Sequence, residues 1–393
     1  MLAGLLFAVR DAEDRPDRLA ATLPFAGTTV IEYQARLLLA AGAAQIVVVV
    51  TRLTPDLLGA ISRIGRRGIA VDAVRSVGEA AEKLHPLARV LIVADGLITG
   101  EGTIRLLAGE GSDALLVIGE GEADAAFERI GGRMAWAGIA RLAPTRLREV
   151  AAMPRDYDPQ SALLRVAAQV GAAHLLLPPG ANAEGHGVAR RASALDVQGR
   201  AVAAAAMTAR QGWFDRLIVA PIGRLALPLL VSRGVPAGFV ALGGVALGLG
   251  GLAAAYFDLF ATGLTLVLAG VIAASIGSAL ADLRDEPRLA KALDGASVFL
   301  PLVAALLVAW RTDLTSGGTT ATVVAVALAG FAGLAERAMP GRKRRPPWGS
   351  PGAYLIVLLA GAIAGAPPIG LVAAGIYAAI TAAAAVEALR QKA

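Results

Sequence analysis

The apolar residues divide the chain into two halves with different patterns. Up to about residue 180, short apolar runs alternate with stretches in which apolar residues recur every three or four positions. Such runs are typical of buried strands, and the longer recurrence is typical of helices with one buried face. Strands that alternate with helices predict a parallel α/β sheet. We therefore expect one Rossmann-like domain, with strands over residues 2–9, 45–51, 69–74, 90–93, 114–118 and 133–139 and helices over residues 28–41, 55–63, 77–84, 102–108, 144–150 and 158–172.

The second half consists of long apolar segments with few charges. Only 19 of the 158 residues from 236 to 393 are Asp, Glu, Lys or Arg, and almost all of these lie between the segments or at their ends. A helix that crosses a hydrocarbon layer of about 30 Å needs roughly 20 apolar residues. We predict an all-α membrane domain with six spans, over residues 236–257, 259–281, 297–310, 319–335, 352–366 and 369–389.

The charges between these segments predict how the protein is oriented. Basic residues near the ends of spans are retained on the cytoplasmic side of a membrane. If the first half is cytoplasmic, only Arg311 is a basic residue on the outer side, and ten lie on the inner side: Arg284, Arg288, Lys291, Arg337, Arg342, Lys343, Arg344, Arg345, Arg390 and Lys392. We expect a multi-pass protein of the inner (cytoplasmic) membrane with both termini in the cytoplasm.

The composition narrows the possible classes of function. A mean hydropathy of +0.62 is typical of a membrane protein. The absence of cysteine excludes disulfides, thiolate metal sites and cysteine nucleophiles. The 37 basic residues are spread along the chain and are balanced by acids in the first half, so we expect no nucleic-acid partner. Met1–Val9 lacks a basic leader and a cleavage site, so we expect no signal peptide.

Two stretches of the first half resemble sugar-phosphate nucleotidyltransferases, GT-A-like enzymes that join a nucleotide to a phosphorylated substrate. Residues 23–50, LPFAGTTVIEYQARLLLAAGAAQIVVVV, contain a Leu-Pro, an Ala-Gly turn, an amphipathic helix, a second Ala-Gly turn and a Val-rich strand. Residues 90–98, VLIVADGLI, resemble the strand that ends in the metal-binding aspartate of that family. The resemblance implies a GT-A nucleotidyltransferase-like domain over residues 1–177, with Asp95 as its candidate nucleotide-binding residue. The alternative for Asp95 is a turn aspartate ahead of Gly96.

The loop before these stretches departs from the family. Active members carry a Gly-rich loop whose backbone N–H groups surround the triphosphate. Residues 7–24, FAVRDAEDRPDRLAATLP, contain no glycine and carry four acids that repel phosphate. Arg10, Arg15 and Arg18 supply positive charge, but side chains do not replace a ring of backbone N–H groups. We therefore expect a structural or regulatory role for this domain.

The segment before the first span resembles the approach to the membrane domain of CDP-alcohol phosphatidyltransferases. Residues 212–240, GWFDRLIVAPIGRLALPLLVSRGVPAGFV, contain an Asp-Arg pair followed by a basic and apolar stretch, which suits a helix at the membrane interface. Members of that family have six spans after a juxtamembrane helix, and some carry an N-terminal cytidylyltransferase domain. The resemblance implies a linker over residues 178–216, a juxtamembrane amphipathic helix over 217–235, and a six-helix CDP-alcohol phosphatidyltransferase-like membrane domain over 236–393.

The catalytic signature of that family is incomplete in this chain. The signature reads Asp-x-x-Asp-Gly-x-x-Ala-Arg, eight residues, then Gly-x-x-x-Asp-x-x-x-Asp, and its carboxylates bind divalent metal and supply a base. When Asp294 is taken as the third aspartate, the other three positions hold Ala273, Ile276 and Val298. One aspartate does not hold two metal ions and also act as a base.

A second alignment uses Asp282 and Asp285 as the first pair, with Glu286 in place of the glycine. Asp282, Asp285 and Asp294 are therefore the candidate catalytic and metal-binding residues. The alternative interpretation is that residues 282–294 form a solvated loop of alternating charges, with Pro287 at a helix start.

These patterns lead to two hypotheses. The first is a catalytically degenerate membrane protein with a scaffold, lipid-binding or regulatory role, which resembles transferases of phospholipid biosynthesis. The second is a divergent CDP-alcohol phosphatidyltransferase, which implies Mg²⁺ as its cofactor. In both, the partner is the lipid bilayer, with a CDP-lipid or phospholipid as the possible ligand. A transporter or channel is disfavoured because the predicted spans hold no ionisable residue away from their ends.

Two further patterns concern packing and histidine. Gly244 with Gly248, and Gly361 with Gly365, have the four-residue spacing that lets helix backbones approach closely. We expect packing within the chain, and the alternative is a homodimer. The histidines, His85, His174 and His186, follow no metal-ligand spacing and are expected on the surface or in turns.

Overall fold

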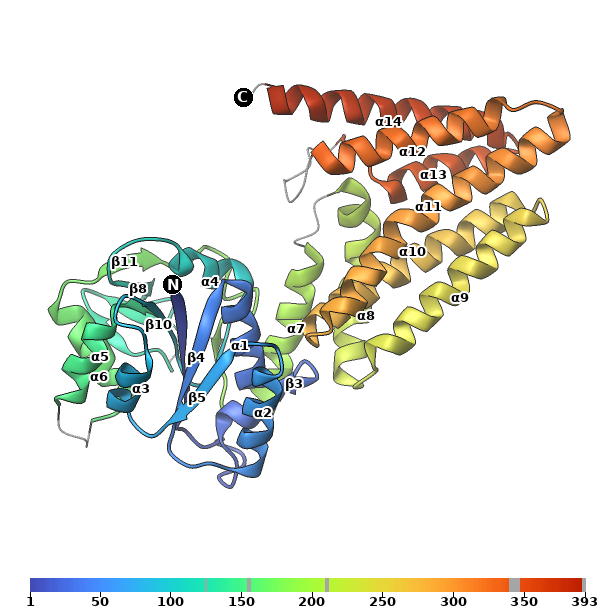
Figure 1. The fold of residues 1–393 in the computed structure, drawn as a ribbon. Helices are drawn as coiled ribbons and strands as arrows, with labels where there is room; N and C mark the ends of the chain where they lie inside the picture. The colour runs from blue at the N-terminus through green and yellow to red at the C-terminus, as the bar shows by residue number, and fades with distance from the viewer. Residues whose placement is uncertain (124–125, 154–156, 209–211, 339–346, 391–393) are drawn as a thin grey trace. The chain divides into compact units, whose positions relative to one another are not determined.

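The structure is a computed structural model that describes residues 1–123, 126–153, 157–208, 212–338 and 347–390 (Figure 1). It divides into two units, Met1–Val202 and Ala203–Ala393. We call the first the α/β unit and the second the helical unit.

The α/β unit is built on a mixed sheet with the strand order β11-β8-β10-β6-β1-β4-β5, in which β9 also pairs with β10. All six predicted strands are present, and the Rossmann-like α/β architecture is confirmed. Every residue of β1 is buried, as its continuous apolar sequence predicts. The strands of this sheet are β1 (Leu2–Ala8), β4 (Ala43–Val50), β5 (Ala70–Val74), β6 (Arg89–Val93), β8 (Ala114–Gly119), β9 (Arg129–Gly131), β10 (Met134–Leu142) and β11 (Ala173–Leu176).

The expectation of a parallel sheet is wrong at β10, which runs antiparallel to both of its neighbours, β6 and β8. Parallel neighbours need a crossover of a dozen or more residues, usually a helix. The described residues between β8 and β10 form only the short strand β9 and no helix. The chain therefore turns back beside β8 in the opposite direction. β11, which pairs parallel to β8, was not predicted.

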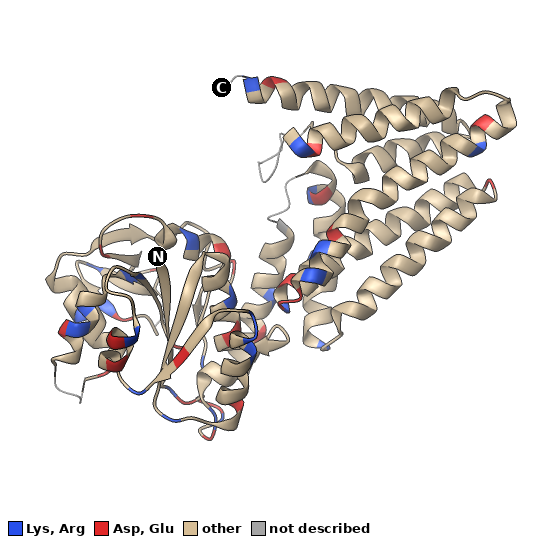
Figure 2. Cartoon of the chain, viewed as in Figure 1, with Lys and Arg blue, Asp and Glu red and all other residues tan. Residues whose placement is uncertain are grey.

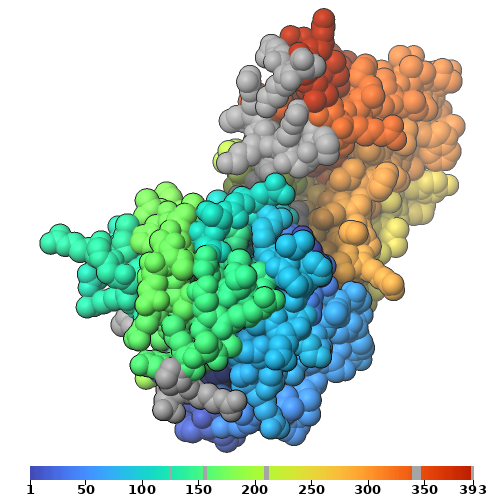
Figure 3. All heavy atoms as spheres, turned by 60° about the vertical axis from the view of Figure 1, so that its left-hand side comes forward, coloured from blue at the N-terminus to red at the C-terminus, as the bar shows by residue number. Residues whose placement is uncertain are grey.

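The helices of the α/β unit match the predicted ranges within a few residues, and side-chain caps mark several of their starts. Thr29 and Glu32 form a capping box at α1, and Ser76 and Asp158 cap α3 and α6. On the face drawn in Figure 3, segments distant in sequence lie side by side, and α3 packs on α5. The helices are α1 (Val30–Ala40), α2 (Pro55–Gly65), α3 (Val77–Lys83), α4 (Glu101–Ala108), α5 (Pro144–Ala151) and α6 (Pro159–Gln169).

The stretch 178–216, which we expected to link the two halves, contains secondary structure. It holds β12 (Gly187–Val188), which pairs with β7 (Leu97–Ile98), and the helix α7 (Ala192–Thr208). Gly185 lies so close to α7 that an added Cβ would be 2.9 Å from the carbonyl oxygen of Gln198. The boundary between the two units falls inside α7.

The helical unit contains the segments that are long and apolar enough to span a membrane. Five described helices meet these criteria: α9 (Ala237–Tyr256), α10 (Phe260–Leu283), α11 (Pro287–Ser316), α12 (Thr320–Ala338) and α14 (Pro367–Arg390). A sixth apolar helix, α13 (Pro351–Ile363), is shorter. The charged residues of these helices lie toward their ends and leave the middle sections apolar (Figure 2). By helix length and composition, the chain is a multi-pass membrane protein.

The third apolar helix differs most from its predicted range, 297–310, because α11 begins ten residues earlier, at Pro287. Residues 287–294 are therefore helical and do not form a loop. In this extension Ala290 and Leu293 are buried, whereas Arg288 and Lys291 are exposed. A helix that continues past the apolar layer with one buried face is stable in water, so hydropathy alone underestimates its length.

Glycines allow α9 and α10 to pack at backbone contact. A Cβ added to Gly251 would lie 2.5 Å from the carbonyl oxygen of Gly263, and one added to Gly270 would lie 2.9 Å from that of Gly244. Gly361 on α13 approaches Gly370 on α14 in the same way. The expectation of close packing within the chain is confirmed for Gly244, Gly248 and Gly361 but is wrong for Gly365, which follows the end of α13 and has open space at its Cβ position.

Candidate functional site

The candidate site lies at the carboxyl ends of β1 and β6. After β1 the chain adds β4 and β5 on one side of that strand, and then returns to add β6 on the other side. In open α/β sheets, ligands bind in the crevice that such a reversal leaves at the carboxyl ends of the strands. Val9 and Arg10 follow β1, and Asp95 lies two residues after β6. Both strands therefore bring polar groups to the crevice.

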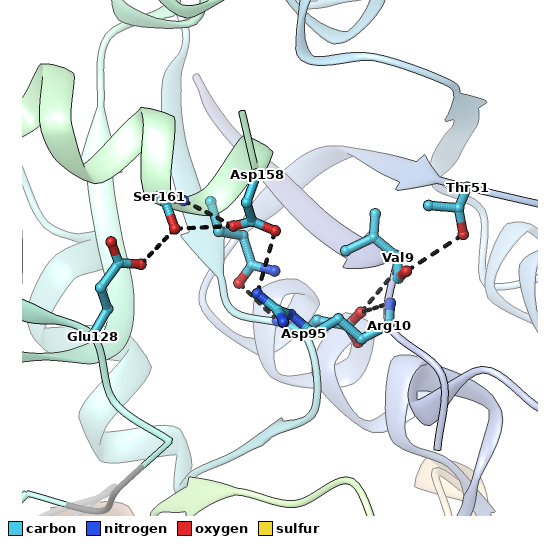
Figure 4. Close-up of polar contacts among 8 residues, drawn as sticks. Val9, Arg10, Thr51, Asp95, Glu128, Asp158 and Ser161 are labelled. Carbon is cyan, nitrogen blue, oxygen red and sulfur yellow. Dashed lines mark hydrogen bonds and ion pairs between the residues drawn. The ribbon is translucent and has the colours of Figure 1, made fainter. Parts of the chain in front are cut away.

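Asp95 is buried at the centre of this site. It is 1% exposed, and its Oδ2 accepts hydrogen bonds of 2.8 Å from the backbone N–H groups of both Val9 and Arg10 (Figure 4). Its own N–H group donates to Oε1 of Gln160 at 3.2 Å. The second carboxyl oxygen, Oδ1, has no hydrogen-bond partner among the described residues. The site therefore contains a buried acceptor that is not satisfied by the protein.

Burial raises the pKa of Asp95 to about 6, although hydrogen bonds from Arg10 and Val9 and the charges of Arg190 and Arg10 act in the opposite direction. The carboxyl group is therefore largely ionised at pH 7 and protonated in mild acid. A perturbed carboxyl group in a crevice is a frequent sign of a functional site.

Asp95 faces a pocket of mixed charge. The pocket is small and opens to solvent at its mouth. Its walls carry positive, negative, amide and aromatic side chains: Arg10, Arg190, Asp95, Glu128, Asp158, Gln160, Phe127 and Trp136.

Most of the charged side chains in the pocket have partners. Arg10 lies 3.3 Å from Asp158, which also accepts a hydrogen bond from the N–H group of Ser161 at 3.0 Å. The hydroxyl group of Ser161 donates to Glu128 at 2.8 Å (Figure 4). Nε of Arg190 is different, because it is buried and has no partner within the described chain. A ligand that offers a donor to Asp95 and an acceptor to Arg190 would satisfy both groups.

The loop after β1 uses its acids in contacts with other parts of the α/β unit. Asp11 pairs with Arg52 at 2.7 Å, Glu13 pairs with Arg191 at 2.6 Å, and Asp14 accepts a hydrogen bond of 3.0 Å from the N–H group of Ala192 at the start of α7. Because the N–H groups of Val9 and Arg10 point to Asp95, this loop does not direct them into the pocket.

Sequence reasoning singled out Asp95 and Arg10, but it missed Asp158, Gln160 and Arg190. Asp158 was included only as the first residue of the predicted helix 158–172, because an Asp-Pro pair is a helix-start signal. Gln160 and Arg190 are brought to Asp95 by the course of the chain, 65 and 95 positions later, and no local pattern marks them.

The three candidate aspartates of the membrane half lie around the turn between α10 and α11. Asp282 is exposed in the last turn of α10, Asp285 is in the turn itself with a φ of 59°, and Asp294 is in the third turn of α11. Asp294 accepts a hydrogen bond of 2.6 Å from the hydroxyl group of Ser278 on α10.

Mg²⁺ prefers carboxylate oxygens arranged around one point. Within the described ranges, no three Asp, Glu or His side chains are grouped so that they could hold a metal ion. Asp282, Asp285 and Asp294 therefore do not fit a three-carboxylate Mg²⁺ site in this arrangement. Their assignment as catalytic residues stays a prediction.

We expected the histidines on the surface or in turns. His85 and His174 are exposed, whereas His186 follows the turn at residues 181–185 and is buried, at 6% exposed. Nδ1 of His186 lies 2.8 Å from the hydroxyl group of Thr99, and its ring lies 5.6 Å from that of Phe127. Burial lowers the pKa of His186 to about 4, so the ring is neutral at pH 7. The pairing of β12 with β7 places this histidine inside the unit.

No model of a known protein family matches the chain, and no curated protein sequence is significantly similar to it. The resemblances described above therefore rest on their motifs alone.

Proposed function

We propose that this chain is a noncatalytic membrane protein whose two units resemble a nucleotidyltransferase fused to a CDP-alcohol phosphatidyltransferase. Its α/β unit serves as a ligand-binding, regulatory domain, and its helical unit serves as a membrane scaffold. Asp95, Gln160 and Arg190 are the residues of the α/β unit that would contact the ligand.

One observation carries this proposal. Oδ2 of Asp95 binds the two backbone N–H groups that follow β1. A nucleotidyltransferase needs N–H groups of this loop for the triphosphate and a free carboxylate for the metal ion. Here Oδ2 of the carboxylate occupies both N–H groups. The unpaired Oδ1 and the unpaired Nε of Arg190 leave a small polar pocket, which suits ligand binding without transfer.

The helical unit supports the same conclusion. The chemistry of a CDP-alcohol phosphotransferase needs several carboxylates around a divalent metal ion and one carboxylate as a base. Asp294 is instead hydrogen bonded to Ser278, Asp282 is exposed, and the described acids of this turn are not grouped as a metal site would need. The second candidate function is a divergent Mg²⁺-dependent transferase. It is supported by the position of Asp282 and Asp285, which lie a few residues before α11, the helix that contains Asp294.

An activity assay on the full-length protein in lipid nanodiscs tests this proposal. With Mg²⁺ present, we expect no pyrophosphate release from CTP plus a sugar or inositol phosphate, and no CMP release from CDP-diacylglycerol plus an alcohol acceptor. Mg²⁺-dependent CMP release that is lost in Asp285→Ala and Asp294→Ala would overturn the proposal. Glu286→Ala is the matched control, because Glu286 is an exposed acid of the same turn.

A further inference from the structure

The helix α8 (Ala220–Ser232) is attached to the helical unit by one face. It continues from η2 (Asp215–Val219), a π-helical turn. Pro221 has no N–H group to donate into this turn, which accounts for the local widening of the helix. Ala220, Gly223 and Leu227 form the buried face. A Cβ added to Gly223 would overlap the side chain of Met207, so this face is closely packed.

The opposite face of this helix is both apolar and exposed. Leu217 and Leu225 are 70% and 81% exposed, and Ile222 and Leu229 are about half exposed. Together they form a continuous row along η2 and α8. An exposed apolar row of this size on a helix that already has a buried face indicates contact with a membrane or another protein.

Positive charge surrounds this apolar row. Arg216, Arg224 and Arg233 are exposed, and none of them forms an ion pair with a residue that the structure describes. The sequence contains no Asp or Glu from residue 216 to residue 257. The surface therefore combines large apolar side chains with uncompensated guanidinium groups, which is the composition of helices that bind anionic lipid surfaces.

The connection to α9 fixes the depth of this surface. The N–H group of Val235 donates to the carbonyl oxygen of Leu230, and Gly234 has a φ of 65°, which closes α8 in a tight turn. The span α9 begins at Ala237, only four residues after Arg233. Since α9 is long and apolar enough to span a membrane, we expect the end of α8 near the edge of the hydrocarbon layer.

We propose that the exposed apolar row of η2 and α8 lies in the interfacial layer of the bilayer, and that Arg216, Arg224 and Arg233 bind the phosphate groups of anionic lipids. This inference rests on the helical unit alone and holds whether or not the chain catalyses a reaction. Guanidinium groups suit this role because they form paired hydrogen bonds with phosphate oxygens.

Quenching of a fluorescent label by brominated lipids tests the proposal. The chain has no cysteine, so Leu225→Cys introduces a single labelling site in the full-length protein. Labelled protein is placed in nanodiscs of phosphatidylcholine and phosphatidylglycerol, with bromine on one lipid or on the other at equal mole fraction. We expect strong quenching, at least about twofold greater by brominated phosphatidylglycerol, because each arginine near the surface favours anionic lipid.

Three variants separate the proposal from general effects of charge. Replacing Arg216, Arg224 and Arg233 together by Gln should abolish the preference for phosphatidylglycerol, whereas replacing them by Lys should keep most of it. Arg66→Gln, Arg75→Gln and Arg148→Gln remove the same charge from exposed positions of the α/β unit and should leave the preference unchanged. Absence of quenching, equal quenching by both lipids, or equal loss in this control would each overturn the proposal.

Discussion

At the scale of single residues, Asp95 shows how one side chain holds a loop and at the same time remains available to a ligand. Its Oδ2 accepts hydrogen bonds from the backbone N–H groups of Val9 and Arg10, which would otherwise lack an acceptor. Its Oδ1 is left without a partner in a pocket that is open to solvent. The carboxylate therefore holds the loop through one oxygen, while its other oxygen is buried without a partner at the wall of the pocket.

Substitutions at Asp95 should separate its hydrogen bonds from its charge. In Asp95→Ala the two N–H groups lose their acceptor, so we expect the α/β unit to lose about 2 to 4 kcal/mol of stability at pH 7. In Asp95→Asn the amide oxygen still accepts both hydrogen bonds, and we expect little loss. Urea unfolding monitored by Trp136 fluorescence measures both variants. Equal losses in Ala and Asn would show that the charge matters and that the hydrogen bonds do not.

The pH dependence of stability provides a second measurement on the same side chain. Because the pKa of Asp95 in the folded state, about 6, lies above the ordinary aspartate pKa of 3.8, the folded state holds the proton more tightly than the unfolded state. The contribution of Asp95 is therefore fully present below about pH 4 and is lost as the pH rises through 6. The stability of the unsubstituted protein relative to Asp95→Asn should fall between pH 4 and pH 7.

At the scale of helices and strands, close backbone contact decides how α9 and α10 pack. Gly251 and Gly263 face each other with room for hydrogen atoms only. In a bilayer, burial of apolar surface gives no preference for helix over lipid, so contacts of this kind carry the association. The neighbouring Gly250 has open space at its Cβ position. The chain thus provides a matched pair of glycines in the same helix.

We expect Gly251→Ala to destabilise the helical unit by about 1 to 3 kcal/mol, because the added methyl group must push two backbones apart. Gly250→Ala should be neutral or slightly stabilising, since alanine favours the helix and meets nothing. Thermal unfolding of both variants in the same detergent measures the difference. If the two variants lose stability equally, the glycine contact does not hold these helices together.

Some helices and strands could be predicted from the sequence, and others could not. Helices were predictable because one buried face imposes a period on their apolar residues, and central strands such as β1 were predictable from their continuous apolar runs. The direction of β10 was not predictable, because it depends on the absence of a helix between β8 and β10. The start of α11 was missed because Arg288 and Lys291 lie on an exposed face, where charge is compatible with a helix. Asp95 could be found from a strand-end motif, whereas Gln160 and Arg190 reach it only through the topology of the sheet.

At the scale of the whole molecule, the chain joins two units that are stable for different reasons. The α/β unit is stabilised because its apolar strands are buried away from water. In the helical unit, apolar side chains that leave the helix contacts would be covered by lipid, so their burial adds little stability. Urea weakens the first kind of stability and acts little on helices inside a detergent micelle. Two such units in one chain should therefore unfold in separate transitions.

The positions of the four tryptophans allow this separation to be measured. Trp136 is 5% exposed in the α/β unit, whereas Trp213, Trp310 and Trp348 belong to the helical unit. A variant in which the last three are Phe reports only on the α/β unit, and Trp136→Phe reports only on the helical unit. In mild detergent we expect the Trp136 signal to change at lower urea concentration than the signal of the other three.

Adding the earlier substitutions to these two reporters tests whether the units are energetically independent. Substitutions far apart and without shared partners have additive effects, so Asp95→Ala should lower the urea midpoint of the Trp136 signal and leave the other signal unchanged. Gly251→Ala should do the reverse. If either substitution moves both midpoints, the two units unfold cooperatively. The helix α7, which contains the boundary between the units, would then transmit stability from one unit to the other. In that case the pocket around Asp95 would be coupled to the membrane helices, as a regulatory role for the α/β unit requires.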